Sequence, residues 1–311
     1  MRNALVLALS LLTPALAAGQ DVFLPEGEIQ NLLANPQQRT IDFKPPVLNE
    51  EQTKELFEGR AKVRADAVQP TADTPATADL RRFDGAIRNQ QDLPWCTAFA
   101  SISAIENVAR QGGFDLDLSE HQHFQTYRVY TLQGAANAAR GTGVIPESGW
   151  PYKGKAQPGW QDLPKVTIGG WGDVRSVADV LSQVSTGRPV ILGVMTTTSW
   201  NNPVGGVVTP TGRSAGGHAI AIVGFNRTAP RPYFVFRNSW GKSWGDSGYG
   251  YLPFDYCNPY DCSFIQYDTV RVPGKPGPTP TATATPIPTP PPVPPAPKPC
   301  GWFKRLFGLC D

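Results

Sequence analysis

The sequence predicts an α+β fold with two lobes, a helical N-terminal lobe and a β-rich C-terminal lobe. Three observations support this prediction. Apolar residues recur at helical spacing from Cys96 onward. Short runs of β-branched and aromatic residues, separated by Gly and Pro, concentrate between positions 190 and 252. Helices that precede strands favour separate layers over alternating βαβ units, so we expect a cleft between the lobes.

Two helical regions are predicted in the first half of the core. The first covers 96–110, and Gly112-Gly113 can end it. Its apolar face is formed by Phe99, Ile102, Ile105 and Ala109. The second covers about 119–139. Helices of this kind bury one face against another layer of the protein.

Four strands are predicted in the second half, at 190–195, 218–225, 233–237 and 249–252. The second and third form a hairpin if 226–232 is a connecting loop. Placing Phe225 opposite Tyr233 sets Asn238 opposite Ile220. His218 is then the diagonal neighbour of Asn238 on the same face, within side-chain reach.

Composition defines a chain large enough for a substantial core. The 311 residues are 40% hydrophobic and include eight tryptophans. A net charge of +2 gives no electrostatic case for a nucleic-acid partner. We divide the chain into five parts: 1–18, 19–78, 79–272, 273–299 and 300–311.

Residues 1–18 are predicted to be a secretory signal peptide. Arg2 supplies the positive start, 5–12 the apolar stretch, and 15–17 a small-residue cleavage site. The stretch is too short to remain as a membrane-spanning helix. We therefore expect a secreted, periplasmic or cell-surface protein, and no later segment is predicted to cross a membrane.

The five cysteines fit an exported chain with one free thiol. Cys257 and Cys262 flank an Asn-Pro turn dipeptide, which favours a local disulfide. Cys300 and Cys310 flank the last segment and form a second natural pair. Cys96 remains. The alternative is that all five are reduced.

The regions on either side of the core are less informative. Residues 19–78 contain one helical candidate, 49–68, with Asn49 as N-cap and Gln52 in a capping box. This region is either a prosegment docked on the core or a linker, and 69–79 is predicted to be an exposed, cleavable connector.

Residues 273–299 contain 13 prolines and predict an extended polyproline stalk. Residues 300–311 combine four apolar side chains, Trp302, Phe303, Leu306 and Phe307, with Lys304 and Arg305. They form either a disulfide-closed loop, which we favour, or a helix with unpaired thiols, because a straight helix would hold the two cysteines about 15 Å apart. Such a tip suggests contact with a surface or membrane; the alternative is a dispensable tail.

Cys96 is the candidate nucleophile. A thiol in the first turn of a helix lies in the positive field of unpaired backbone N–H groups, which stabilises the thiolate and lowers the thiol pKa. Thiolate attack on a carbonyl creates an oxyanion, and the backbone N–H of Cys96 and the side-chain amide of Gln90 are candidate donors. The residues around Gln90 are also compatible with an ordinary polar loop.

His218 is the candidate general base. Of the three histidines, His121 and His123 lie at an apparent helix start and are predicted to be surface or capping groups. Without further context, His218 could equally be a buried histidine of the core that has no catalytic role. In the predicted hairpin, Asn238 can accept a hydrogen bond from its ring and leave the other nitrogen facing Cys96.

Trp240 and Trp244 can shield the predicted hydrogen bond between His218 and Asn238 from water. The alternative role for Asn238 is to cap a turn before Ser-Trp-Gly.

In their joint order, these segments resemble a papain-type cysteine protease over about 79–272. The motifs are Asn89-Gln90 with Cys96-Thr97-Ala98-Phe99, Leu118-Ser119-Glu120, Trp150-Pro151-Tyr152, Gly217-His218-Ala219 with Val223-Gly224-Phe225, and Arg237-Asn238-Ser239-Trp240-Gly241-Lys242-Ser243-Trp244-Gly245 with Gly248-Tyr249. The resemblance implies a papain-like fold. It also implies that Cys96 is the nucleophile, His218 the acid/base, Asn238 the orienting residue and Gln90 the oxyanion donor, with Gly217 and Trp240 beside the substrate.

The chain departs from that family in four places. Thr97 stands where Trp usually follows the nucleophile, Pro94-Trp95 replaces Gly-Ser, and Leu93 replaces a disulfide cysteine. A Cys-Asn-Gly-Gly segment that lines the substrate is missing, with Gly134 as a stand-in. The missing cysteine pattern favours a bacterial member of the family.

The resemblance implies a peptidase acting on peptides or proteins, with no metal or organic cofactor, and the signal peptide predicts that it is secreted. The sequence does not fix the oligomeric state, and we expect a monomer. Three widely spaced histidines also argue against a zinc site. Two alternatives remain: a non-enzymatic adhesion or binding protein on a protease-like scaffold, and another thiol enzyme such as a cell-wall peptidase or transglutaminase.

Overall fold

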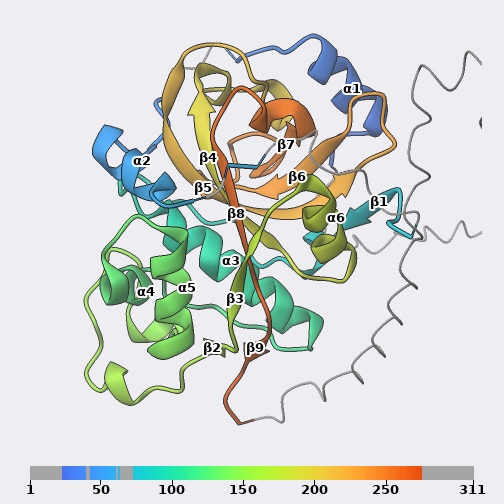
Figure 1. The fold of residues 1–311 in the computed structure, drawn as a ribbon. Coiled ribbons are helices and arrows are strands. Elements are labelled where there is room, and N and C mark those ends of the chain that lie inside the picture. Colours follow the sequence, from blue (N-terminus) through green and yellow to red (C-terminus); the bar gives the residue numbers. More distant parts are fainter. Residues whose placement is uncertain (1–22, 40–42, 61, 64–72, 275–311) are drawn as a thin grey trace, which may run out of the picture. The chain divides into compact units, whose positions relative to one another are not determined.

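A computed structural model describes residues 23–39, 43–60, 62–63 and 73–274 (Figure 1). The predicted signal peptide, residues 69–72 of the predicted connector, most of the proline-rich segment, and Cys300 and Cys310 lie outside the described residues. The prediction of an exposed connector is wrong for its second half, because Thr77–Asp79 forms β1 and pairs with β5 (Ser214–Asn226).

An antiparallel sheet of seven strands forms the centre of the fold. Its order is β3-β8-β4-β5-β6-β7, and β1 also pairs with β5. The strands are β1 (Thr77–Asp79), β3 (Trp171–Val174), β4 (Val190–Thr197), β5 (Ser214–Asn226), β6 (Tyr233–Arg237), β7 (Tyr249–Pro253) and β8 (Cys262–Tyr267). A small second sheet joins β2 (Thr167–Ile168) to β9 (Val270–Arg271).

Six α-helices surround the sheet in the described part of the chain. They are α1 (Glu26–Ala34), α2 (Glu50–Phe57), α3 (Cys96–Gln111), α4 (Glu120–Tyr127), α5 (Leu132–Gly141) and α6 (Val177–Ser185). Helices α3, α4 and α5 gather together, and α3 packs on β4 and β5 (Figure 1). Helix α6 packs on β1, β4 and β5.

Two hydrophobic cores correspond to the two expected lobes. One joins α1 and α6 to the sheet and includes Trp200, Phe234 and Phe236. The other joins α3 and α5 to the sheet and includes Cys96 and Ile105. The predicted α+β arrangement is therefore confirmed.

The four predicted strands and the helix at 96–110 are present, whereas the second predicted helix is in fact two. The chain breaks between α4 and α5 at Arg128, whose φ of 50° is left-handed. The prediction for His123 is also wrong. Its ring is fully buried and contacts Ser101 Oγ at 3.0 Å, because the inner face of α4 packs on α3.

The β5–β6 hairpin contains a bulge that the prediction lacked. Phe225 pairs with Phe234 rather than Tyr233, and the register shifts between Ile222 and Gly224. Beyond the bulge Ala221 pairs with Arg237, which is the predicted register. The extra residue therefore leaves the predicted neighbourhood of His218 and Asn238 intact.

A disulfide joins Cys257 and Cys262, with Cα atoms 5.4 Å apart, and Cys96 is a free, buried thiol. In the described part of the chain, no helix is both long and apolar enough to span a bilayer.

The N-terminal region is docked on the core rather than separate from it. Helix α1 buries Ile29, Leu32 and Leu33 in the core of the sheet. Helix α2 begins after Asn49 with the predicted capping box, because Asn49 and Gln52 each accept the other's backbone N–H. It ends at Phe57, short of the predicted 68.

Candidate active site

Cys96 occupies the first position of α3, and its side chain is fully buried. Trp95 precedes it as N-cap and stacks on Phe124 of α4, with ring centroids 4.7 Å apart. This stacking fixes the start of α3 against its neighbour. The sulfur lies close to the backbone N–H groups of Thr97 and Ala219. Because Ala219 follows His218 on β5, the thiol and the imidazole come from directly adjoining elements.

His218 and Asn238 meet as the hairpin register predicts. Nε2 of His218 and Oδ1 of Asn238 are 2.9 Å apart, and both side chains are buried. Nδ1 of His218 is buried and has no hydrogen-bond partner among the described residues. The imidazole therefore has one nitrogen held by the amide and one uncommitted nitrogen.

Trp240 covers the His–Asn pair. Its ring stacks on His218 at 4.4 Å and 28°, and Trp244 meets Trp240 edge-on at 5.4 Å and 90°. Excluding water from a hydrogen bond strengthens it, because the local dielectric constant is low. Both tryptophans thus lie where the sequence predicts a shield.

Gln90 lies beside this pair, in a segment that runs antiparallel to 238–241. Its backbone N–H donates to the Ser239 carbonyl at 2.8 Å, and the neighbouring Asn89 bridges to Trp240. The Gln90 side chain is fully buried. Its Nε2 donates to Leu93 O at 2.8 Å and to Pro46 O at 3.2 Å.

Residues 43–57 cover this site, which explains why its polar groups are buried. Leu48 N–H donates to Gly217 O at 2.8 Å, and Thr53 Oγ1 accepts from Gly217 N–H at 2.7 Å. The Leu48 side chain is 1% exposed and belongs to the same apolar cluster as Cys96. Phe43 packs on Trp240 with ring centroids 5.9 Å apart. We call residues 43–57 the strap.

The strap is anchored on both sides of the site. Glu55 Oε1 accepts from Tyr130 N–H at 3.1 Å, in the helical lobe. Beyond α2, Arg60 forms an ion pair with Asp173 at 2.8 Å and Val63 N–H donates to Cys262 O at 3.2 Å, both in the sheet. Sequence analysis missed these contacts, since only the capping box at Asn49 marked the region as ordered.

Burial sets the charge state of the candidate pair. It raises the pKa of the Cys96 thiol to about 12, although the nearby backbone N–H groups act in the opposite direction. Burial also lowers the pKa of His218 to about 4, against the effect of Asn238. The expected low thiol pKa is therefore not found in this covered state, because desolvation outweighs the field of the helix start. Both groups are neutral near pH 7.

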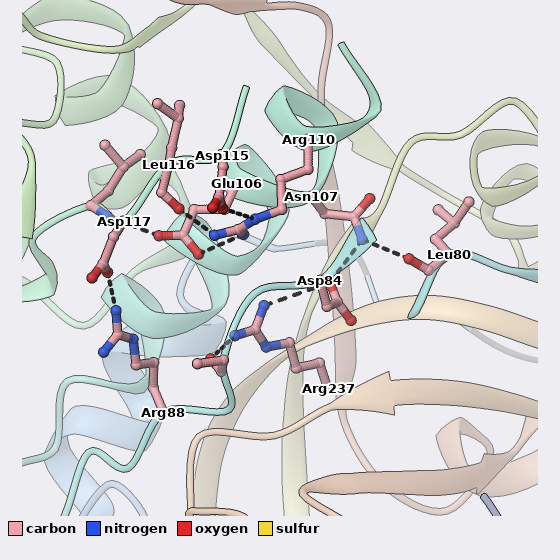
Figure 2. A network of polar contacts seen from close by, with 12 residues as sticks. Leu80, Asp84, Arg88, Glu106, Asn107, Arg110, Asp115, Leu116, Asp117 and Arg237 are labelled. Atoms are coloured by element: carbon pink, nitrogen blue, oxygen red, sulfur yellow. Dashed lines mark hydrogen bonds and ion pairs between the residues drawn. The ribbon is translucent and has the colours of Figure 1, made fainter. Parts of the chain in front are cut away.

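A buried charge network ties the nucleophile's helix to the strand that leads to Asn238 (Figure 2). Arg237, on β6, lies 3.6 Å from Asp84 Oδ1, and both side chains are almost fully buried. Asp84 also accepts from Asn107 of α3 at 2.7 Å and from the Tyr249 hydroxyl at 3.0 Å. Burial raises the pKa of Asp84, and the charge of Arg237 opposes that shift. No periodicity in the sequence marked Asp84.

Two further positions near the site have structural partners. Thr97 Oγ1, directly after Cys96, is 2.8 Å from the Tyr127 hydroxyl. Gly134 lies in α5, where its N–H donates to the N-cap Thr131 at 2.9 Å. The structure therefore gathers Gln90, Cys96, Gly217, His218, Asn238 and Trp240 into one site. Gly134 lies on α5 in the helical lobe, and its role beside the substrate stays a prediction.

A helix-start cysteine beside an imidazole–amide pair, placed between a helical layer and an antiparallel sheet, defines the class of hydrolases that attack peptide bonds with a thiol. The model of the papain family cysteine proteases matches residues 74–259, more than half of the chain. The chain belongs to this family.

Curated relatives agree with the family assignment. Peptidase 1 of the mite Dermatophagoides farinae is 29% identical over 221 residues, which are 65% of this chain and 68% of the mite protein. Human cathepsin O is 28% identical over 202 residues, 59% of this chain and 62% of the human protein. The chain thus spans somewhat less than two thirds of cathepsin O.

Solved structures show the same fold. The Carica candamarcensis protease CMS1MS2, crystallised with E-64, has a TM-score of 0.53 and 25% identity; the match covers 62% of this chain and 98% of that protein. Xylellain, a cysteine protease from Xylella fastidiosa, has a TM-score of 0.55 and 20% identity, over 76% of this chain and 98% of that protein.

Proposed function

We propose that this chain hydrolyses peptide bonds in peptides or proteins, with Cys96 as nucleophile, His218 as acid/base, Asn238 as orienting residue and Gln90 as oxyanion donor. The observation that carries the proposal is the 2.9 Å contact between His218 Nε2 and Asn238 Oδ1, which leaves Nδ1 uncommitted on the strand beside Cys96. Gly217 would bind the substrate backbone, since its N–H and C=O already bind the strap.

The reaction follows from these positions. The Cys96 thiolate attacks the scissile carbonyl and forms a C–S bond, while Gln90 Nε2 and the Cys96 N–H stabilise the oxyanion. The His218 imidazolium gives its proton to the leaving amine as the C–N bond breaks. His218 then takes a proton from water, whose oxygen attacks the thioester. The C–S bond breaks, the carboxylic acid is released, and the Cys96 thiolate and His218 imidazolium are regenerated. No step requires a metal or an organic cofactor.

We also propose that the strap keeps the full chain latent. The carbonyl of Pro46 takes the hydrogen bond that an oxyanion would take, and the strap buries both the thiol and the imidazole. Removing the strap exposes both groups to water, so the thiol pKa falls and the imidazole pKa rises. A thiolate–imidazolium pair is then favoured.

Several further assignments are part of the proposal. Residues 1–18 direct export to the periplasm, cell surface or medium, and Leu93 in place of the family's disulfide cysteine favours a bacterial source. Residues 300–311 contact a surface or membrane, and the enzyme acts as a monomer.

The test is covalent labelling of Cys96 with an epoxide directed at thiol proteases, with the modified peptide located by mass spectrometry. The purified chain is compared before and after limited proteolysis on the N-terminal side of β1 removes the strap, beside the matched variant Cys96→Ala. We expect stoichiometric labelling only after removal, and none in Cys96→Ala. Absence of labelling in both forms of the wild type would favour the non-enzymatic binding protein.

A further inference from the structure

Residues 23–39, which we call the anchor, pack on the sheet away from the strap. Helix α1 lies in the anchor and α2 in the strap, and the two helices lie apart in Figure 1. The anchor buries Ile29, Leu32 and Leu33, which are 3%, 4% and 1% exposed, in the core of the sheet. The spacing i, i+3 and i+4 places these side chains on one helix face, so α1 presents an apolar stripe to the sheet.

Polar groups of β6 and of the loop before it fasten both ends of α1. The Tyr233 hydroxyl donates to Glu26 Oε2 at 2.5 Å in the first turn of the helix. At the other end, Arg231 N–H donates to Gln30 Oε1 at 3.0 Å, and the Arg231 guanidinium donates to Leu33 O at 2.8 Å. The last bond satisfies a carbonyl that the end of a helix leaves unpaired. Helix α1 is therefore held by specific contacts as well as by apolar burial.

The C-terminal end of the anchor holds the loop that carries Trp244. The Arg39 guanidinium donates to Ser243 O at 2.9 Å and to Gly245 O at 3.0 Å. These two carbonyls flank Trp244, whose ring meets edge-on the tryptophan that covers the imidazole. The anchor thus supports the shield over the catalytic pair.

Substrate competes with the strap and not with the anchor. The strap binds the N–H and C=O of Gly217 and accepts a hydrogen bond from Gln90 Nε2, all of which the proposed reaction uses. In the described part of the chain, no hydrogen bond or ring contact joins the anchor to Cys96, His218 or Gln90. Catalysis therefore requires only the strap to leave. Departure of the anchor would expose the part of the core that α1 covers, which is unfavourable.

We propose that the anchor stays bound to the sheet when the strap leaves, so that the active enzyme consists of two non-covalently associated chains. The inference rests on the proposed latency and adds which part of the N-terminal region departs. Because the strap connects the anchor to β1, the chain must be cut twice, before β1 and between Arg39 and Phe43. A cut before β1 alone leaves the strap tethered to the anchor, at an effective concentration on the order of millimolar, and the strap rebinds the cleft.

The experiment inserts a recognition sequence for a site-specific protease into the full-length chain, within 64–72, between Arg39 and Phe43, or at both places. After cleavage, gel filtration under native conditions and intact-mass measurement show which fragments remain together. The epoxide directed at thiol proteases reports access to Cys96. Before cleavage, each variant should label as slowly as the uncut wild type, which shows that the insertions leave the latent fold intact.

We expect the doubly cut chain to retain the fragment that contains 23–39 in equal amount, to lose the strap, and to label stoichiometrically at Cys96. The chain cut only within 64–72 should keep its fragments together and label at least about tenfold more slowly. Separation of the anchor from a labelled enzyme would overturn the inference, and so would retention of the strap by the doubly cut chain or equally fast labelling after the single cut. If the strap is gone and Cys96 still does not label, the proposed function fails instead, because retention of the anchor is read from mass alone.

Leu33→Ala and Glu28→Ala are matched variants that test the apolar contact in the doubly cut chain. Leu33 is buried in the core, whereas Glu28 is exposed in the first turn of α1. We expect Leu33→Ala to raise the dissociation constant of the anchor fragment on the order of 10²-fold, because a buried side chain is shortened. Glu28→Ala should leave it unchanged. The measurement is the fraction of the fragment retained as the protein is diluted, and equal retention in both variants would overturn the role of α1 in holding the second chain.

Discussion

Shortening Leu48 to alanine should open the site of the intact, uncleaved chain. Leu48 is 1% exposed within the apolar cluster that contains Cys96, so the substitution removes buried methyl groups and leaves a cavity. Such a substitution destabilises the packed state that buries the side chain by about 2–5 kcal/mol. The cost falls on the closed state alone, because in the open state the side chain is in water.

A shift of about 3 kcal/mol raises the open fraction by roughly 10²-fold. The assay is the rate at which iodoacetamide alkylates Cys96 at pH 7. In the closed state the buried thiol has a pKa of about 12, so labelling at this pH reports opening. We expect Leu48→Ala to be labelled about 10²-fold faster than the wild type.

Glu51→Ala is the matched control, because Glu51 lies on α2 and is exposed. It should be labelled at the wild-type rate. If Leu48→Ala is labelled no faster than Glu51→Ala, the strap does not control access to the thiol and the account of latency is refuted.

Two other predictions concern stability. Burial lowers the pKa of His123 to about 3, whereas an unfolded histidine takes up a proton near pH 6.5, so stability falls as the pH drops from about 6.5 toward 3. For the wild type, this lowers the free energy of unfolding by about 2 kcal/mol at pH 5. The free energy of unfolding of His123→Gln, measured by urea titration, should therefore fall by about 2 kcal/mol less than that of the wild type between pH 7 and pH 5. An equal fall in both proteins would contradict this. Arg237→Met should lower the free energy of unfolding by about 3–5 kcal/mol, because the buried Asp84 carboxylate loses the opposite charge of its ion pair. In thermal melts, the double variant Arg237→Met/Asp84→Asn should be more stable than Arg237→Met alone. If the stability losses of the two single variants simply add in the double variant, the Arg237–Asp84 ion pair does not contribute to stability.

The sequence was sufficient where one local rule decided the outcome. Helical periodicity placed Cys96 at the start of α3, and the Asn49 capping box placed the start of α2. The hairpin argument reached the His218–Asn238 contact despite a wrong starting pair, because the bulge near Gly224 restores the register before the site.

Tertiary packing decided the rest. His123 and Asp84 are buried because of elements distant in sequence, which single-residue patterns do not report. Likewise, the positive field at the start of α3 was correctly expected, but the strap removes water from Cys96 and desolvation reverses the sign of the pKa shift. The position of a segment tens of residues away thus controls the chemistry of the thiol.

The most direct test of the central claim is hydrolysis of a denatured protein substrate by the full-length chain after limited proteolysis, with Cys96→Ala and Asn238→Ala as matched variants. The account predicts peptide cleavage by the wild type, none by Cys96→Ala, and a strongly lowered kcat in Asn238→Ala, whose imidazole has lost its orienting amide. Cleavage by Cys96→Ala at the wild-type rate would contradict it.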